Sequence, residues 1–248
     1  MISYLRMVQV EFFKSKRSFI WIIVFIAPLV MIFYGASNYV KFQEVLVHQH
    51  EHAWVKLYVQ IVIWYSILLY PMSIGVLGVL LSRTEHAENT WKYILALPYH
   101  RNTVYLSKLT NLLVMTGISI SFFSIGILLC GFILNVPGSV PYTIILGNTF
   151  LGWVTSWPIL SIQLWLSIRF SGVGIPMAIS AITSIIGVIV TNSQYAKFYI
   201  WSYPALSMLP KGEGFDTESS LFIFVVSIFL FFMTNLIAIF DFVKRDIA

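Results

Sequence analysis

The sequence SRTEHAENTWKYILALPYHRNTVYLSK, residues 82–108, is the longest stretch of mixed polarity between two uninterrupted apolar runs. It carries two of the ten carboxylates and four of the fifteen Lys and Arg residues of the chain. A charge placed in lipid costs several kcal/mol, so these side chains need water or another protein around them. We therefore expect this stretch to connect two membrane spans outside the bilayer.

Helical periodicity divides the first part of this stretch into two faces. If it is a helix, one side carries the apolar residues Ala87, Trp91, Ile94 and Leu95, and the other side carries the polar residues Glu85, Glu88, Asn89 and Lys92. Ser82 and Glu85 have capping-box spacing, although the preceding apolar helix can also simply continue. Pro98 ends the helix. The alternative is an ordinary solvated loop, and periodicity alone leaves both readings open.

The composition defines the broad class of the protein. Hydrophobic residues make up 58% of the chain and charged residues 10%, whereas a soluble domain carries about 25% charged residues. This balance is typical of an integral membrane protein. A lone cysteine, Cys130, gives neither a disulfide framework nor a thiolate metal site.

Six apolar runs are each long enough to cross roughly 30 Å of hydrocarbon at 1.5 Å per residue. They lie near residues 19–39, 58–81, 109–134, 142–168, 173–191 and 221–240. The fourth run contains Pro158 after Trp157, so we expect a kink or a broken helix there. The predicted fold is all-α: residues 1–248 form a single transmembrane domain of six helices, with residues 82–108 as a cytoplasmic loop.

Residues 1–17 precede the first span and have an amphipathic pattern. Tyr4, Leu5, Val8 and Phe12 share one face of a helix, and basic residues lie mostly opposite them. This pattern favours a helix lying in the membrane interface. The alternative is a plain cytoplasmic segment, whereas a cleaved signal peptide does not fit the long apolar run that follows.

The distribution of basic residues predicts the orientation in the membrane. Eleven Lys and Arg residues fall on the side of the N-terminus and four on the other side. By the positive-inside rule, both termini and the 82–108 loop are cytoplasmic. The eleven are Arg6, Lys14, Lys16, Arg17, Arg83, Lys92, Arg101, Lys108, Arg169, Lys244 and Arg245, and the four are Lys41, Lys56, Lys197 and Lys211.

Two of the loops on the other side have features of their own. Residues 40–57 contain HQHEH, in which His48 and His52 have workable metal-ligand spacing on a helix. A second cluster that would complete a tetrahedral site is missing, so we expect no metal. Residues 192–220 are apolar in their first half, which we expect at the outer membrane interface, and acidic near their end.

Several classes of function are disfavoured by what the sequence lacks. No Asp, Glu, Lys, Arg or His falls inside the six runs, although ion-coupled transporters normally need such groups at membrane depth. Neither an HExxH motif nor a P-loop is present. We expect a transport subunit without enzymatic activity of its own, driven by another subunit. An ion-coupled carrier or channel, and a membrane enzyme or scaffold, remain alternatives.

The layout and one motif resemble the permeases of ABC-2 type transporters. The motif is ENTWKYILALPYHRNTVYLSKL, in which Glu88, Trp91, Leu95, Pro98, Tyr105 and Lys108 stand at the positions of the family pattern. The resemblance in topology covers the whole chain, and the motif covers about 25 residues. Within the family, the chain is most similar to the lantibiotic-immunity permeases, the MutE/EpiE group.

The resemblance implies that residues 82–98 form a coupling helix on a separate ATPase subunit. Trp91, Ile94 and Leu95 are then the apolar anchors. Glu85, Glu88 and Lys92 set the register of the contact, and Pro98 ends the helix. ATP and Mg²⁺ belong to the ATPase, and this chain binds no cofactor.

The resemblance also implies partners and a substrate. The immunity systems combine two ATPase copies with a second permease, and a homodimer of this chain is the other arrangement. They expel a cationic, amphipathic peptide, and the alternative substrate is another amphipathic toxin or drug. Glu213, Asp216 and Glu218 are candidate contacts for a cationic peptide, or simply part of a soluble loop. We expect the bilayer as a partner and no nucleic acid.

Overall fold

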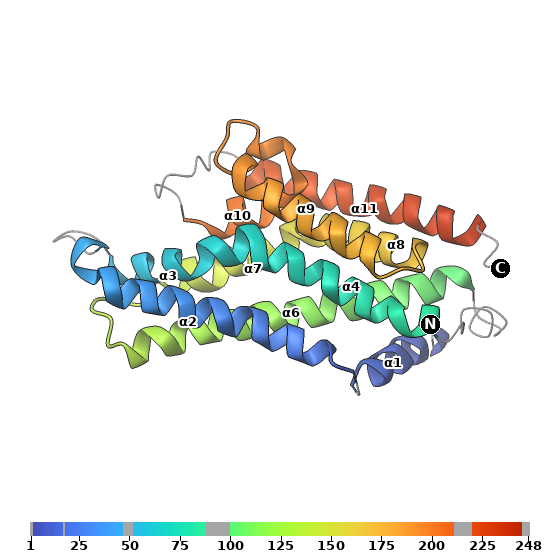
Figure 1. Cartoon of the computed structure of the whole chain (residues 1–248), viewed down its shortest axis with the longest axis horizontal. Helices are drawn as coiled ribbons and strands as arrows, with labels where there is room; N and C mark the ends of the chain where they lie inside the picture. The colour runs from blue at the N-terminus through green and yellow to red at the C-terminus, as the bar shows by residue number, and fades with distance from the viewer. Residues whose placement is uncertain (1, 17, 47–51, 88–99, 211–219, 245–248) are drawn as a thin grey trace.

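The computed structural model shows an elongated bundle whose long helices run along its long axis (Figure 1). It describes residues 2–16, 18–46, 52–87, 100–210 and 220–244, and within these ranges the chain forms helices and short connections without a β-strand. The apolar composition explains this choice, because helices satisfy all their backbone hydrogen bonds internally in lipid.

The first third of the chain builds one side of the bundle. Helix α1 (Ile2–Lys16) lies at one end and is followed by the long helix α2 (Ile20–Leu46). The chain then returns through α3 (Ala53–Trp64), a π-helical turn η1 (Tyr65–Leu69) and α4 (Tyr70–Ala87). These last three elements form one continuous helical path, and α2 packs against both α3 and α4.

The next elements cross the bundle twice. Helix α6 (Arg101–Ile133) runs back along α1 and α2. The π-helical turn η2 (Thr143–Gly147), α7 (Asn148–Thr155) and α8 (Trp157–Arg169) then form a single broken path, bent by 40° between α7 and α8. Pro158 stands in the first turn of α8, so the break expected in this run is confirmed.

The last helices cover the remaining side. Helix α9 (Gly174–Val190) packs on α4, and two 3₁₀ turns, η3 (Ala196–Phe198) and η4 (Ile200–Ser202), follow it. The short helix α10 (Tyr203–Met208) comes next. Helix α11 (Ser220–Lys244) then runs beside α8 to the C-terminal end.

Four helical paths are long and apolar enough to cross a membrane, within the part of the chain that the structure describes. They are Ile20–Gln43, Ala53–Arg83, Arg101–Ile133 and Leu221–Lys244, and the bent pair α7–α8 adds a fifth if it counts as one span. The fifth predicted run, residues 173–191, corresponds to α9, which is apolar but has only 17 residues. The length and composition of the described helices therefore support four spans, or five with the bent pair, and six spans remain a prediction.

The connection after α9 lies deeper than the sequence suggested. We expected its apolar first half at the outer interface, and Tyr195 and Phe198 are indeed exposed. In contrast, α10 is buried in the bundle, where the Tyr58 hydroxyl donates a hydrogen bond to the Met208 carbonyl at 2.7 Å and Asn148 Nδ2 donates to the same oxygen at 3.4 Å. These bonds supply partners for the end of a helix too short to satisfy itself.

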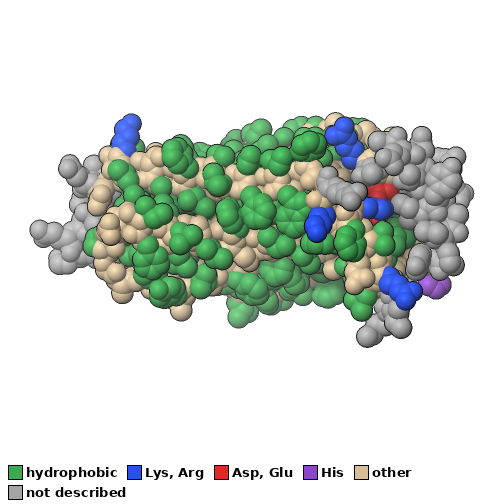
Figure 2. Space-filling view, turned by 90° about the horizontal axis from the view of Figure 1, so that it is seen from below, with side chains coloured by type: hydrophobic (Ala, Val, Ile, Leu, Met, Phe, Trp, Pro, Cys, Tyr) green, Lys and Arg blue, Asp and Glu red, His purple; other side chains and the backbone are tan. Residues whose placement is uncertain are grey.

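Polarity is distributed as a bilayer requires. On the face seen in Figure 2, hydrophobic side chains cover the middle of the molecule, and Lys and Arg side chains lie toward its ends, most of them at one end. Both termini lie at that end, together with the end of α4 and the start of α6 (Figure 1). The two termini therefore lie on the same side of the bundle.

Small residues allow close approach at the opposite end. A Cβ atom added at Gly131 would come within 2.2 Å of Trp54 Cζ3, and Gly152 approaches Met208 in the same way. The Trp54 ring is fixed, because its Nε1 donates a hydrogen bond to the Val136 carbonyl at 3.1 Å. This indole cannot move aside without losing that bond.

We expect Gly131→Ala to destabilise the protein by about 1–3 kcal/mol, the usual cost of forcing extra volume into a packed interior. Thermal unfolding in detergent measures the change. Gly147→Ala is the matched control, since a Cβ atom there meets nothing within 4 Å. Equal melting temperatures for the two variants would contradict the close contact between Gly131 and Trp54.

Candidate functional site

Among the described residues of α1, the buried polar side chains lie on one side of the helix, in a stripe that faces the bundle. Glu11 and Ser15 are only 2% and 3% exposed, and Met7 continues the stripe one turn earlier. They stand four residues apart, which places them on one side of the helix. A buried carboxylate requires a compensating charge, so this stripe defines where ion pairs must form.

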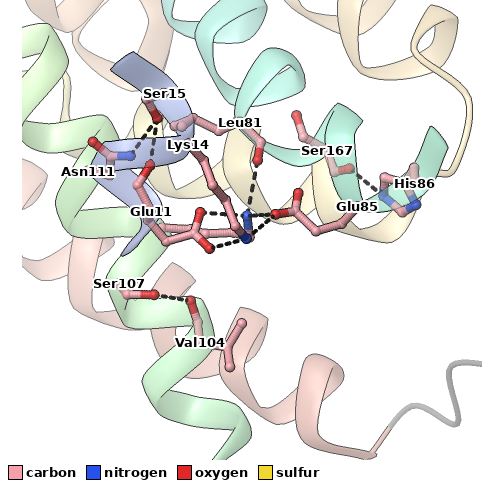
Figure 3. A network of polar contacts seen from close by, with 11 residues as sticks. Glu11, Lys14, Ser15, Leu81, Glu85, His86, Val104, Ser107, Asn111 and Ser167 are labelled. Atoms are coloured by element: carbon pink, nitrogen blue, oxygen red, sulfur yellow. Dashed lines mark hydrogen bonds and ion pairs between the residues drawn. The ribbon is translucent and has the colours of Figure 1, made fainter. Parts of the chain in front are cut away.

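Lys108, in the first third of α6, supplies that charge. Its side chain is fully buried. Its Nζ lies 2.9 Å from Glu11 Oε2, 2.9 Å from Glu85 Oε1 and 3.0 Å from the Leu81 carbonyl oxygen. Three acceptors match the three protons of an ammonium group. Glu11 and Glu85 converge on this point from α1 and α4 (Figure 3).

Lys14 completes the set from the outer side. Its Nζ lies 3.1 Å from Glu11 Oε1 and 3.1 Å from Glu85 Oε1, and its side chain keeps 38% of its surface exposed. We call Glu11, Lys14, Glu85 and Lys108 the charge cluster. Two carboxylates and two ammonium groups give it no net charge, which allows Glu11, Glu85 and Lys108 to be buried near lipid.

Neutral hydrogen bonds fix the helices around the charge cluster. Asn111 Nδ2 on α6 donates to Ser15 Oγ at 2.9 Å, and Ser15 Oγ donates to the Glu11 carbonyl at 2.9 Å. The hydroxyls of Tyr4 and Thr110 also share a hydrogen bond between α1 and α6. Helix α1 is therefore held on α6 along most of its length.

Glu85 and Lys14 of the cluster lie outside the candidate membrane spans, and both have shifted pKa values. Burial alone would raise the pKa of Glu85, but the ammonium groups of Lys108 and Lys14 outweigh burial and hold it below the ordinary value. Burial would lower the pKa of Lys14, but Glu11 and Glu85 raise it above the ordinary value. Both groups are charged in the folded protein at neutral pH.

Other contacts at the same end tie α11 to its neighbours. Arg169 Nη1 on α8 lies 2.8 Å from Asp241 Oδ1, and Trp165 Nε1 donates to Asp241 Oδ2 at 2.9 Å. Arg101 Nη1 on α6 donates to the Val243 carbonyl at 2.9 Å. The Arg169–Asp241 pair is partly exposed, so it contributes less than the buried cluster.

The predicted coupling residues divide into two groups. Glu88, Trp91, Lys92, Ile94, Leu95 and Pro98 lie outside the described residues, and so do Glu213, Asp216, Glu218 and residues 48–51 of the His-rich sequence, whereas His52 is described and exposed. Glu85 is described, but its position differs from the expectation of a contact with a partner. It is 1% exposed, and its described ion pairs are with Lys14 and Lys108 of the same chain.

The predicted face of α1 is described as well. Tyr4 reaches Thr110, and Phe12 lies edge-on to Trp21 with ring centroids 5.9 Å apart, whereas Leu5 is 54% exposed. Val8 is half-buried. This face borders α2 and α6, and the face turned to the charge cluster is the neighbouring one with Glu11.

The sequence reasoning missed the pairing of Glu11 with Lys108. Lys108 was expected in the polar segment before the third span, and the structure buries it instead because α6 begins at Arg101. One signal was available: Glu11 and Ser15 stand on one side of α1 together with the apolar Met7, whereas the exposed basic residues Arg6 and Lys16 lie on other sides of the helix. No group of three potential metal ligands occurs in the part of the chain that is described.

Taken together, the apolar helical paths and the charged end define a multi-pass helical membrane protein. The family model described as "ABC-2 family transporter protein" matches residues 7–187. The chain therefore belongs to the ABC-2 transporter family and is a permease subunit that works with an ABC ATPase. No curated protein and no solved structure matches the chain.

We expect Lys108→Met to destabilise the protein by about 3–5 kcal/mol, because it leaves two buried carboxylates with only Lys14 as a partner. Adding Glu11→Gln should recover part of the loss by removing one uncompensated charge. Arg169→Met is the control and should cost about 1 kcal/mol or less, as expected for a partly exposed pair. Thermal unfolding in detergent reports all three, and similar losses for Lys108→Met and Arg169→Met would contradict the burial of the cluster.

The contribution of Glu85 to the stability of the fold should decrease in acid. Its pKa in the folded protein is below the ordinary value of 4.5, so the contribution is fully present above about pH 4.5 and is lost as the pH falls through the lowered value. Unfolding of the natural protein and of Glu85→Gln, measured from neutral to acid pH, should show a difference that shrinks in acid. A constant difference would show that Glu85 is not ionised in the fold.

Proposed function

We propose that this permease subunit belongs to an ATP-driven exporter and that residues 88–98, directly after α4, form its contact with the ATPase. Family membership carries the proposal, and the charge cluster gives it a mechanism. Helix α4 continues without interruption to Ala87. A displacement of the segment after Ala87 therefore acts on α4 first.

The charge cluster then distributes that displacement. Glu85 stands three residues before residue 88 and is bound to Lys108 of α6 and to Lys14 of α1. Separating buried opposite charges costs several kcal/mol, so α1 and α6 follow the end of α4. Glu85 thus contributes to coupling from inside this chain, while Trp91, Ile94 and Leu95 are the apolar anchors and Glu88 and Lys92 the polar contacts on the ATPase.

Six membrane crossings with both termini in the cytoplasm complete the arrangement. Five follow from the long helical paths and the bent α7–α8 pair, and α9 is the sixth, since 17 apolar residues reach the lower limit of a spanning helix. The two termini lie at one end of the bundle, as an even number of crossings requires. The surplus of Lys and Arg residues at that end supports the proposal that this end faces the cytoplasm.

The proposed substrate is an antimicrobial peptide of the lantibiotic type, expelled from the membrane for self-immunity or resistance. The support is the resemblance of the chain to the immunity permeases and the acidic residues Glu213, Asp216 and Glu218, whose charge is complementary to that of a cationic peptide. Two ATPase copies that bind ATP and Mg²⁺, and a second permease or a second copy of this chain, complete the transporter. Another amphipathic toxin or drug is the alternative substrate.

Affinity purification of the chain from its native membrane tests the assembly. Co-elution of a P-loop ATPase and a second permease supports the immunity-type exporter. An ATPase recovered without a second permease indicates a homodimer and opposes the immunity assignment. Transport in vesicles without nucleotide, and no ATPase in mild detergent, would replace the proposal with an ion-coupled carrier or channel.

Trp91→Ala and Leu95→Asp should each reduce recovery of the ATPase, because each removes an apolar anchor. For a central interface residue, the loss of affinity should be about 30-fold, which corresponds to about 2 kcal/mol. Co-purification and ATPase stimulation are the measurements, and membrane insertion should stay normal. His48→Ala is the control and should change none of them. Unchanged coupling in both anchor variants would disprove the assigned contact.

A further inference from the structure

The outer surface of α6 carries an apolar groove that lies outside the charge cluster. It has a volume of about 550 Å³ and is bordered by Phe25 of α2 and Trp153 of α7. Val114 and Ile125 of α6 line it and are 44% and 55% exposed. The described residues that line this groove carry no ionisable side chain, so an occupant in contact with them is apolar along its length.

The absence of a side chain at Gly117 makes the surface concave. A Cβ atom there would lie 3.3 Å from Trp153 Cζ2, so the indole lies close over the glycine. Trp153 Nε1 donates to Thr116 Oγ1 at 3.2 Å, which holds the ring in place as a wall. Between Thr110 and Ile125 the groove follows α6 for about 22 Å at 1.5 Å per residue. This shape suits one extended hydrocarbon chain.

Aromatic side chains connect the groove to α1. Phe122 in the groove lies edge-on to Phe25 with centroids 5.0 Å apart, Phe25 stacks on Trp21 at 6.0 Å, and Trp21 meets Phe12 of α1 at 5.9 Å. The Thr110 end of the groove is joined to α1 by the hydrogen bond with Tyr4. An amphiphile in the groove therefore has its polar end at α1.

A positive charge stands on the part of α1 that the aromatic side chains reach. Lys16 follows Phe12 by one turn, lies on the same side of α1 and is exposed. The nearby carboxylates of Glu11 and Glu85 are buried in the charge cluster, so their charges do not face the surface. Positive side chains at the membrane surface attract anionic lipid headgroups. Each one raises the preference for an anionic lipid over a neutral lipid by about fivefold.

We propose that this groove binds one acyl chain of an anionic phospholipid, with the headgroup beside Lys16. A cationic peptide does not fit it, because the groove offers no carboxylate. The bound lipid would lie along α6 and beside Phe25 of α2, with its headgroup at α1, whose inner side is held by the charge cluster. The site is therefore a binding site for a membrane lipid and is independent of the transported substrate.

Photocrosslinking in vesicles tests the site. Ser121 lines the groove and is exposed, and its hydroxyl donates to the Gly117 carbonyl of its own helix, so a benzoylphenylalanine there replaces no described hydrogen bond between helices. The full chain is placed in vesicles of equal parts phosphatidylglycerol and phosphatidylcholine, and crosslinked lipids are identified by mass spectrometry. We expect about fivefold enrichment of phosphatidylglycerol at position 121.

Two variants decide the outcome. The same probe at Leu129, exposed on α6 outside the groove, should crosslink both lipids in equal amounts. Lys16→Gln should abolish the enrichment at position 121. Equal labelling at positions 121 and 129 would overturn the proposal, and so would enrichment that survives Lys16→Gln. In native membranes, crosslinking of position 121 to a polypeptide would assign the groove to another subunit instead.

Discussion

The ammonium group of Lys108, enclosed by Glu11 and Glu85, is the interaction on which the arrangement of α1, α4 and α6 depends. Each of these ions alone would carry a desolvation cost of several kcal/mol in the interior. Together with Lys14 these ions have no net charge. Their charges compensate one another only when all three helices keep this register. A shift of one helix by a single turn would separate the charges and leave at least one of them buried without a partner. The cluster therefore specifies one relative placement of three helices that apolar packing alone would allow to slide.

Its position in the chain connects this constraint to function. The cluster lies at the boundary where the apolar run of α6 begins, so the charges are buried by protein while the bilayer-facing middle stays uncharged. Deeper in the bundle, the helices are joined by neutral hydrogen bonds, such as Ser124 Oγ with Thr149 Oγ1 at 2.7 Å. Such bonds contribute about 1 kcal/mol or less each and can exchange during movement. The strong contacts are thus at the end from which α4 leads into the predicted coupling segment, and the weaker ones lie deeper in the bundle.

Much of the architecture follows from the sequence because hydrophobicity is a local property. The helical paths, the break before Pro158 and the gathering of both termini at one end could all be read from apolar runs and charge placement. The burial of α10 could not, since an apolar stretch looks the same at an interface and inside a bundle. The cluster was missed for a related reason. Glu11 and Lys108 are 97 residues apart, and only packing decides that a lysine next to an apolar run faces a carboxylate instead of water. The five predicted anchor and register residues between 88 and 98, and Pro98 as the end of that helix, remain predictions from periodicity and resemblance.

Helix α1 brings these features together because its faces have different partners. Its polar stripe is fixed by ions to α4 and α6, and its aromatic face continues through Trp21 and Phe25 into the groove on α6. In the proposed coupling, a movement of α4 that preserves the ion pairs carries both α1 and α6 with it. The aromatic face of α1 and the groove on α6 then move together relative to the surrounding bilayer. A lipid bound in the groove, as we propose, would move with them, so the composition of the membrane would act on the same helices that follow the end of α4.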